Sequence, residues 1–127
     1  MKEILGTWKL LSFYKLDDFG KKNHIMGEKP IGSINYTNTH MSALLAYDGY
    51  SQDIIDTING ETYLSYGGRY DGNDKIVYHH VEICSNPNWM GRSLKRNYKI
   101  EDNKLTIWAE EKLNGVWQSV TLEWIKA

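Results

Sequence analysis

Turn signals recur along this chain at intervals of about 8–12 residues, and no other feature of the sequence limits the fold as strongly. Asn114-Gly115 suits a type I′ hairpin turn, because both central positions of that turn need positive φ. Asp102-Asn103 separates NYKIE from KLTIWAE in the same way, and residues 71–74 separate SYGGRY from KIVYHHVEI. Three successive hairpins predict an up-and-down antiparallel meander over the second half of the chain.

The first half of the chain also contains strands, although their spacing is less regular. Residues 7–15 alternate between apolar and polar side chains, which places Trp8 and Tyr14 on the same predicted face. Residues 33–37 and 41–47 form a predicted hairpin. These segments add the strands that a closed sheet needs.

Two segments do not follow the strand pattern. Residues 16–32 form a polar loop that is too long for a tight hairpin, and its segment 19–31 is long enough to lie over an open barrel end. Residues 51–59 place their isoleucines on one helical stripe, with Ser51 as the N-cap and Asn59-Gly60 as the stop. The sequence therefore predicts one short helix beside the strands.

Together these segments predict an all-β fold of about eight strands in a single domain, residues 1–127. An eight-stranded antiparallel up-and-down sheet of this length can close into a β-barrel, which removes its exposed edges. The interior of such a barrel is large enough for one small ligand. A flat sandwich is the alternative architecture.

Charge and composition exclude several classes of function. The 127 residues carry a formal net charge of −1, and the positive side chains are scattered along the chain. We therefore expect no binding to nucleic acid or to an acidic membrane surface. No apolar run approaches the ~18 residues that span a bilayer, and the first residues do not resemble a signal peptide. Cys84 is the only cysteine, which excludes an internal disulfide and favours a cytoplasmic location.

A series of short motifs resembles the lipocalin-like domain family of small bacterial and fungal calycin-type barrels. In chain order these motifs are Gly6-Thr7-Trp8-Lys9-Leu10, Pro30-Ile31-Gly32-Ser33-Ile34-Asn35-Tyr36, Met41-Ser42-Ala43, Tyr66-Gly67-Gly68-Arg69-Tyr70, His79-His80-Val81-Glu82, Asn86-Pro87-Asn88-Trp89-Met90-Gly91, and Arg96 ahead of Leu105. The resemblance covers nearly the whole chain. It implies a barrel that holds a small, mostly apolar molecule, with the tryptophan of the first motif packed across the closed end. Some barrels of this shape catalyse isomerisation or cyclisation in secondary metabolism, and the resemblance transfers no catalytic set and no cofactor.

The stretch YHHVEIC, residues 78–84, suggests a metal site at first sight, but strand alternation separates its members. His79 shares a predicted inward face with valines and Ile83, whereas His80, Glu82 and Cys84 share the outward face. Adjacent histidines on opposite faces cannot bind one metal, and a zinc site needs three or four ligands. We therefore expect no metal and no other cofactor.

His79 and Arg96 are the residues most suited to chemistry in the cavity. A histidine in an apolar cup can orient a ligand or move a proton, or it can be a structural residue bonded to a tyrosine. Arg96 lies between apolar residues of its strand, so it needs a partner: Glu110, Glu123 or a carboxylate on the ligand. The structural alternative is that Arg96 closes the barrel end against Trp8.

Tyrosines supply an apolar wall with hydroxyl tips, which is typical of a site for an aromatic molecule. The predicted ligand-binding residues are Tyr14, Tyr36, Tyr66, Tyr70, His79, Trp89, Arg96 and Tyr98. Trp89 and Met90, in a loop, either line the barrel mouth or meet a second subunit, so a homodimer is one of the alternatives.

The function predicted from these residues is the binding of a small hydrophobic or aromatic metabolite. The alternative is an isomerase or cyclase in which His79 moves a proton while Arg96 and a tyrosine stabilise an oxyanion. The sequence does not decide whether the protein is an enzyme.

Overall fold

A computed structural model of the protein describes residues 2–113 and 116–127. The predicted type I′ turn at Asn114-Gly115 therefore lies outside the described residues. The elements in chain order are η1 (Lys2–Ile4), β1 (Gly6–Leu16), β2 (Lys22–Asn23), β3 (Ile31–Tyr36), β4 (His40–Ala46), α1 (Gln52–Thr57), β5 (Tyr63–Gly72), β6 (Ile76–Cys84), η2 (Pro87–Trp89), β7 (Ser93–Glu101), β8 (Lys104–Leu113) and β9 (Val116–Lys126).

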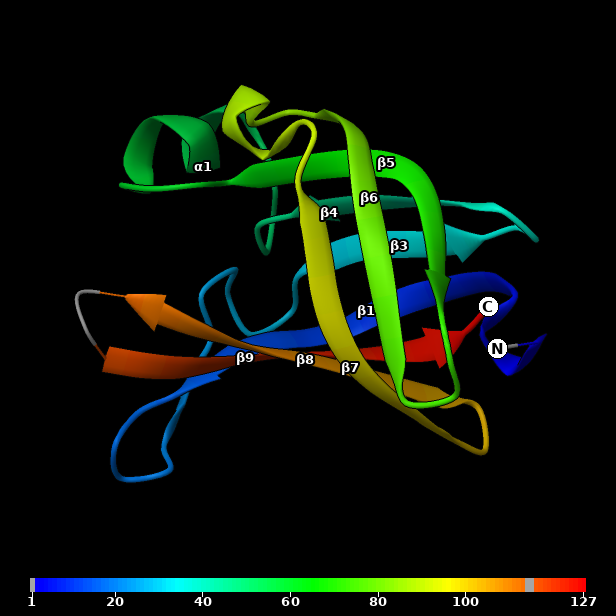
Figure 1. The fold of residues 1–127 in the computed structure, drawn as a ribbon. Helices are drawn as coiled ribbons and strands as arrows, with labels where there is room; N and C mark the ends of the chain where they lie inside the picture. Colours follow the sequence, from blue (N-terminus) through cyan, green and yellow to red (C-terminus); the bar gives the residue numbers. More distant parts are fainter. Residues whose placement is uncertain (1, 114–115) are drawn as a thin grey trace.

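The strands form one antiparallel sheet that closes on itself (Figure 1). The order is β2-β1-β3-β4-β5-β6-β7-β8-β9, and β1 also pairs with β9, for example at Trp8↔Lys126 and Lys15↔Val120. Apart from the two-residue β2, each strand pairs with its neighbours along the chain, and eight strands complete the ring. The predicted up-and-down β-barrel is confirmed, and the closing pair rules out a flat sandwich.

Side-chain alternation places the core inside the ring. Along β8, Leu105, Ile107 and Ala109 are buried, while Thr106 and Trp108 between them are only partly buried. This period of two is what a strand with one face on a closed interior requires.

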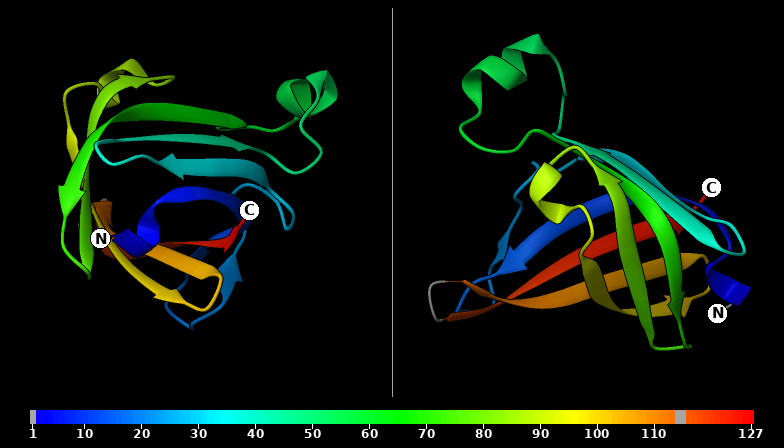
Figure 2. Two further views of the ribbon diagram at one scale, coloured as in Figure 1. Left: turned by 90° about the vertical axis from the view of Figure 1, so that its right-hand side faces the viewer. Right: turned by 45° about the horizontal axis from the view of Figure 1, so that its top comes forward.

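One end of the barrel is closed by the N-terminal segment, which crosses it in Figure 2. The Trp8 side chain is 1% exposed, and its indole N–H donates to the Ile4 carbonyl at 2.9 Å. Lys126 places its Nζ atom 4.6 Å from the centroid of the Trp8 ring. Among the described residues, Lys126 is the cation observed over Trp8, whereas Arg96 lines the cavity.

Tyr14 does not share the face of Trp8 as predicted, because β1 contains a β-bulge between them. The pairing with β9 shifts register between Leu10 and Ser12, so one extra residue reverses the alternation beyond that point. Phe13 and Lys15 then line the interior, whereas Ser12 bonds outward to Glu123 at 2.7 Å.

A second β-bulge, between β5 and β6, reverses the predicted faces of Ile83 and Cys84. Gly67 pairs with Ile83 and Gly68 with Val81, which leaves Glu82 as the extra residue. Beyond Glu82 the alternation reverses, so Ile83 is 68% exposed and Cys84 is 8% exposed, opposite to the prediction. Glycine is needed here, because a Cβ atom on Gly68 would lie 2.0 Å from the His80 carbonyl oxygen.

The predicted helix is present as α1 and stands outside the barrel wall (Figure 2). Ser51 is its N-cap and accepts a hydrogen bond from the Ile54 N–H, as predicted, but the helix ends at Thr57 with Ile58 as the C-cap. Among the described residues, no helix is long and apolar enough to cross a membrane.

Candidate functional site

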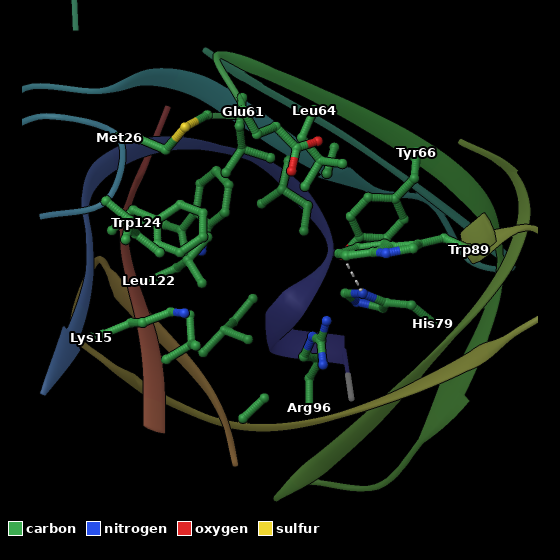
Figure 3. A pocket seen from close by; sticks show the side chains of 18 of the residues that line it. Lys15, Met26, Glu61, Leu64, Tyr66, His79, Trp89, Arg96, Leu122 and Trp124 are labelled. Atoms are coloured by element: carbon green, nitrogen blue, oxygen red, sulfur yellow. Dashed lines mark hydrogen bonds between the residues drawn. The ribbon is translucent and has the colours of Figure 1, made fainter. Parts of the chain in front are cut away.

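The barrel encloses a cavity of about 410 Å³, shown in Figure 3. This is within the ~300–1,000 Å³ range of small-molecule pockets. Its wall is mainly apolar, with side chains from β1, β4, β5, β8 and β9 that include Phe13, Leu45, Leu64, Ile107, Leu122 and Trp124. Because the apolar side chains of these strands alternate inward, the cavity follows directly from the period-two pattern.

His79 faces this cavity from β6, on the inward face that alternation predicts. It is 1% exposed, and both of its ring nitrogens are engaged: Nε2 lies 2.7 Å from the Tyr36 hydroxyl and Nδ1 lies 2.9 Å from the Tyr66 hydroxyl. Burial, together with the nearby Arg96 and His80, lowers the pKa of His79 to about 3. The imidazole is therefore neutral at neutral pH.

The two tyrosines bonded to His79 are also neutral. Burial raises the pKa of Tyr36 well above its ordinary value, with a further increase from nearby tyrosines. Burial also raises the pKa of Tyr66, although the positive charge of the nearby Arg96 guanidinium opposes that increase. Tyr36, His79 and Tyr66 thus form a chain of neutral hydrogen-bonding groups that ends at the cavity.

Arg96 lines the cavity from β7, the strand that pairs directly with the β6 strand of His79 (Figure 3). It pairs in the sheet with Val77, two residues before His79 on β6. Neither predicted carboxylate partner reaches it, because Glu110 is exposed and Glu123 is paired with Lys104 and Ser12. Among the described residues, Arg96 forms no ion pair.

The chain matches the lipocalin-like domain family over residues 5–126, which is nearly its whole length. It belongs to the lipocalin-like domain family. The match agrees with the closed eight-stranded barrel and with a cavity of ligand size. No curated protein and no solved structure matches the chain significantly. A lipocalin-like barrel indicates ligand binding in general and leaves the ligand to be argued from the cavity.

The predicted tyrosines are found at different depths of the lipocalin-like barrel. Tyr66 lines the cavity and packs against Trp89, with the two ring centroids 5.9 Å apart. Tyr36, Tyr70 and Tyr98 are buried, but their side chains are not part of the cavity wall. The hydroxyl of Tyr70 donates to the Thr37 carbonyl, and that of Tyr98 donates to the Asn73 carbonyl.

Tyr14 is placed outside the cavity, which corrects its predicted position. Its ring lies 4.5 Å from the Lys22 Nζ atom and makes an edge contact with His24. The β1 bulge is the physical reason, since it exchanges the faces of Phe13 and Tyr14.

Several residues of the cavity mouth were not predicted individually. Ile25 and Met26 come from the long loop before β3, which was expected to cover an open end, and residues 58–61 come from the segment after α1. Trp124 lines the cavity, and its buried indole N–H has no acceptor among the described residues. Apolar residues within a polar loop, as at Ile25-Met26, are the sequence signal that could have identified this part of the wall.

The outward face of β6 carries the remaining polar residues of YHHVEIC. The His80 ring lies 2.9 Å from the Asp71 carboxylate and 2.7 Å from the Ser93 hydroxyl. The Nε2 atom of His40 lies 3.9 Å from the Oε2 atom of Glu82. Within the described part of the chain, no three His, Cys, Asp or Glu side chains gather as metal ligands do.

Proposed function

We propose that this lipocalin-like protein binds one small hydrophobic or aromatic metabolite inside the barrel. The observation that carries the proposal is the mainly apolar cavity of about 410 Å³. Phe13, Trp89 and Trp124 supply aromatic faces to its wall, and a few polar groups converge on one part of it. Such a combination is typical of small-molecule sites.

The enzyme alternative has less support from the same geometry. It needs His79 to exchange a proton near neutral pH, but both ring nitrogens are bonded to tyrosines and the pKa of His79 is lowered to about 3. A general acid or base works best when its pKa lies near the working pH. Binding without catalysis is therefore the function that we propose.

The cellular location and the binding partners of the protein are also part of this proposal. A cytoplasmic location rests on the single cysteine, Cys84, which is buried and cannot form an internal disulfide. The near-zero net charge supports a small molecule rather than a nucleic acid as the partner. Trp89 packs on Tyr66 at the cavity, which supports the ligand-lining role over a homodimer contact.

A cavity-filling substitution tests the proposal. Ala109 is 7% exposed and lines the cavity, so Ala109→Phe should fill part of it. We expect the affinity for the neutral fluorescent probe N-phenylnaphthylamine, measured by titration, to fall about tenfold or more.

The matched control is Thr106→Phe, which adds a phenyl ring to the same strand on its outward face. This control should bind the probe as the unmodified protein does. Equal affinities for all three proteins, or no probe binding by any of them, would contradict the proposal.

A further inference from the structure

Arg96 places a positive charge in the cavity wall that no described side chain balances. Its Nη1 atom donates to the Lys95 carbonyl at 3.4 Å, and it forms no ion pair within the described residues. A guanidinium has five N–H donors and stays charged at any cellular pH, so most of its binding capacity remains free. A cation in an apolar site is costly unless an anion or several hydrogen bonds compensate it.

His79 and Tyr66, two cavity-lining groups whose pKa values the Arg96 charge influences, are both neutral. His79 is uncharged at neutral pH because burial and the guanidinium itself lower its pKa. Burial raises the pKa of Tyr66, so this hydroxyl keeps its proton. Among the described residues of the cavity wall, Arg96 and Lys15 supply two positive charges against the single carboxylate of Glu61, and this excess favours an anionic group on the ligand.

The hydrogen bonds around Tyr66 indicate where its proton points. The Arg96 guanidinium lies near enough to Tyr66 for its charge to oppose the increase in the pKa of this hydroxyl, and a guanidinium can only donate hydrogen bonds. If the buried Tyr36 hydroxyl donates to His79 Nε2, then Nδ1 carries the proton and donates to Tyr66. The Tyr66 oxygen then accepts from His79, so its own O–H does not point at His79 and can donate into the cavity. His79 acts in this arrangement as a positioning residue.

We propose that the ligand carries a single carboxylate, which pairs with the Arg96 guanidinium and accepts a hydrogen bond from Tyr66. This inference rests on the proposed function and names the ligand class within it. The planar fork of arginine matches the two carboxylate oxygens. A group with two negative charges would leave one of them unpaired beside Arg96, so the geometry favours a monoanion. The apolar body of the ligand lies against Phe13, Leu122 and Trp124.

The second cation of the cavity wall provides a matched control. Lys15 lines the cavity from β1, and Figure 3 shows it on the opposite side from His79 and Tyr66. Tyr66 lies across the cavity from Lys15 (Figure 3) and within the influence of the Arg96 charge, so the hydroxyl that would assist carboxylate binding belongs to the Arg96 side of the cavity. Removing the charge of Lys15 should therefore leave carboxylate recognition intact.

The experiment compares decanoate with decanol, which have the same apolar chain and differ in the head group. Each displaces bound N-phenylnaphthylamine, and the head-group preference is the ratio of the decanol to the decanoate concentration that displaces half of the probe. We expect Arg96→Gln to lower this ratio about tenfold or more, and Tyr66→Phe about threefold. Lys15→Gln should leave the ratio unchanged.

The neutral probe separates the failure of this inference from the failure of the proposed function. Unchanged N-phenylnaphthylamine affinity in Arg96→Gln shows that the cavity is intact, so the ratio then reports the head group alone. A ratio that is unchanged in Arg96→Gln, or that falls in Lys15→Gln instead, overturns the assignment of the carboxylate to Arg96. A wild-type protein that does not bind the neutral probe overturns both proposals.

Discussion

Acidification from about pH 7 to about pH 4 is expected to lower the free energy of unfolding by about 3 kcal/mol through His79 alone. The pKa of His79 is about 3 in the folded protein against 6.5 in the unfolded chain, so the unfolded chain binds the additional proton. The stability contributed by the neutral imidazole is complete above about pH 6.5. It is lost as the pH falls toward 3, at about 1.4 kcal/mol per pH unit within that window.

Urea unfolding at several pH values measures this loss. His79→Gln keeps a polar side chain between Tyr36 and Tyr66 but cannot titrate, so the slope between about pH 6.5 and pH 5 should disappear. His80→Gln is the matched control, since His80 lies next in sequence on the outward face and should leave the slope in place. The same slope in His79→Gln as in the wild type would contradict this account of His79.

Gly68→Ala is expected to lower the free energy of unfolding by about 3 kcal/mol or more. An added Cβ atom would lie 2.0 Å from the His80 carbonyl oxygen and 2.9 Å from the Glu82 nitrogen, and both are backbone atoms. Backbone cannot move aside as a flexible side chain can, so the bulge between β5 and β6 would have to rearrange.

The neighbouring glycine provides the control for this substitution. A Cβ atom on Gly67 would lie 3.0 Å from the Met41 carbonyl oxygen, a close contact that a small shift relieves. Gly67→Ala should therefore cost clearly less than Gly68→Ala in urea unfolding. Equal costs for the two substitutions would show that the bulge accommodates a side chain, contrary to this account.

The order of strands could be predicted because its determinants are local. Turn residues such as Asp102-Asn103 and the alternation of side chains on both sides of them specify neighbouring antiparallel strands. The inward orientation of His79 also follows from alternation, because β6 is regular from Ile76 to Val81. Closure of the sheet then follows from the number of strands.

The faces of Tyr14 and Cys84 could not be predicted in this way. Each lies beyond a β-bulge, and a bulge is determined by pairing with another strand rather than by the residues of the bulged strand alone. Gly67-Gly68 was a local indication, since glycines inside a strand often mark bulges.

The alternation of side chains also does not predict how far along the barrel axis a buried residue lies. Tyr36, Tyr70 and Tyr98 are buried as expected, but the period of two does not distinguish the closed end from the cavity. Likewise, the sequence left the partner of Arg96 open, because only the fold shows that Glu123 is already paired with Lys104.

The location of a bound probe tests the central claim, a ligand-binding cavity, most directly. Trp89 and Trp124 line the cavity, whereas Trp8 lies at the closed end and Trp108 on the outward face of β8. In a nitrogen–proton correlation spectrum, with indole signals assigned by single Trp→Phe substitutions, saturating N-phenylnaphthylamine should shift the signals of Trp89 and Trp124. The signals of Trp8 and Trp108 should stay in place. Shifts confined to Trp8 or Trp108, or no shift at saturation, would contradict a ligand site inside the barrel.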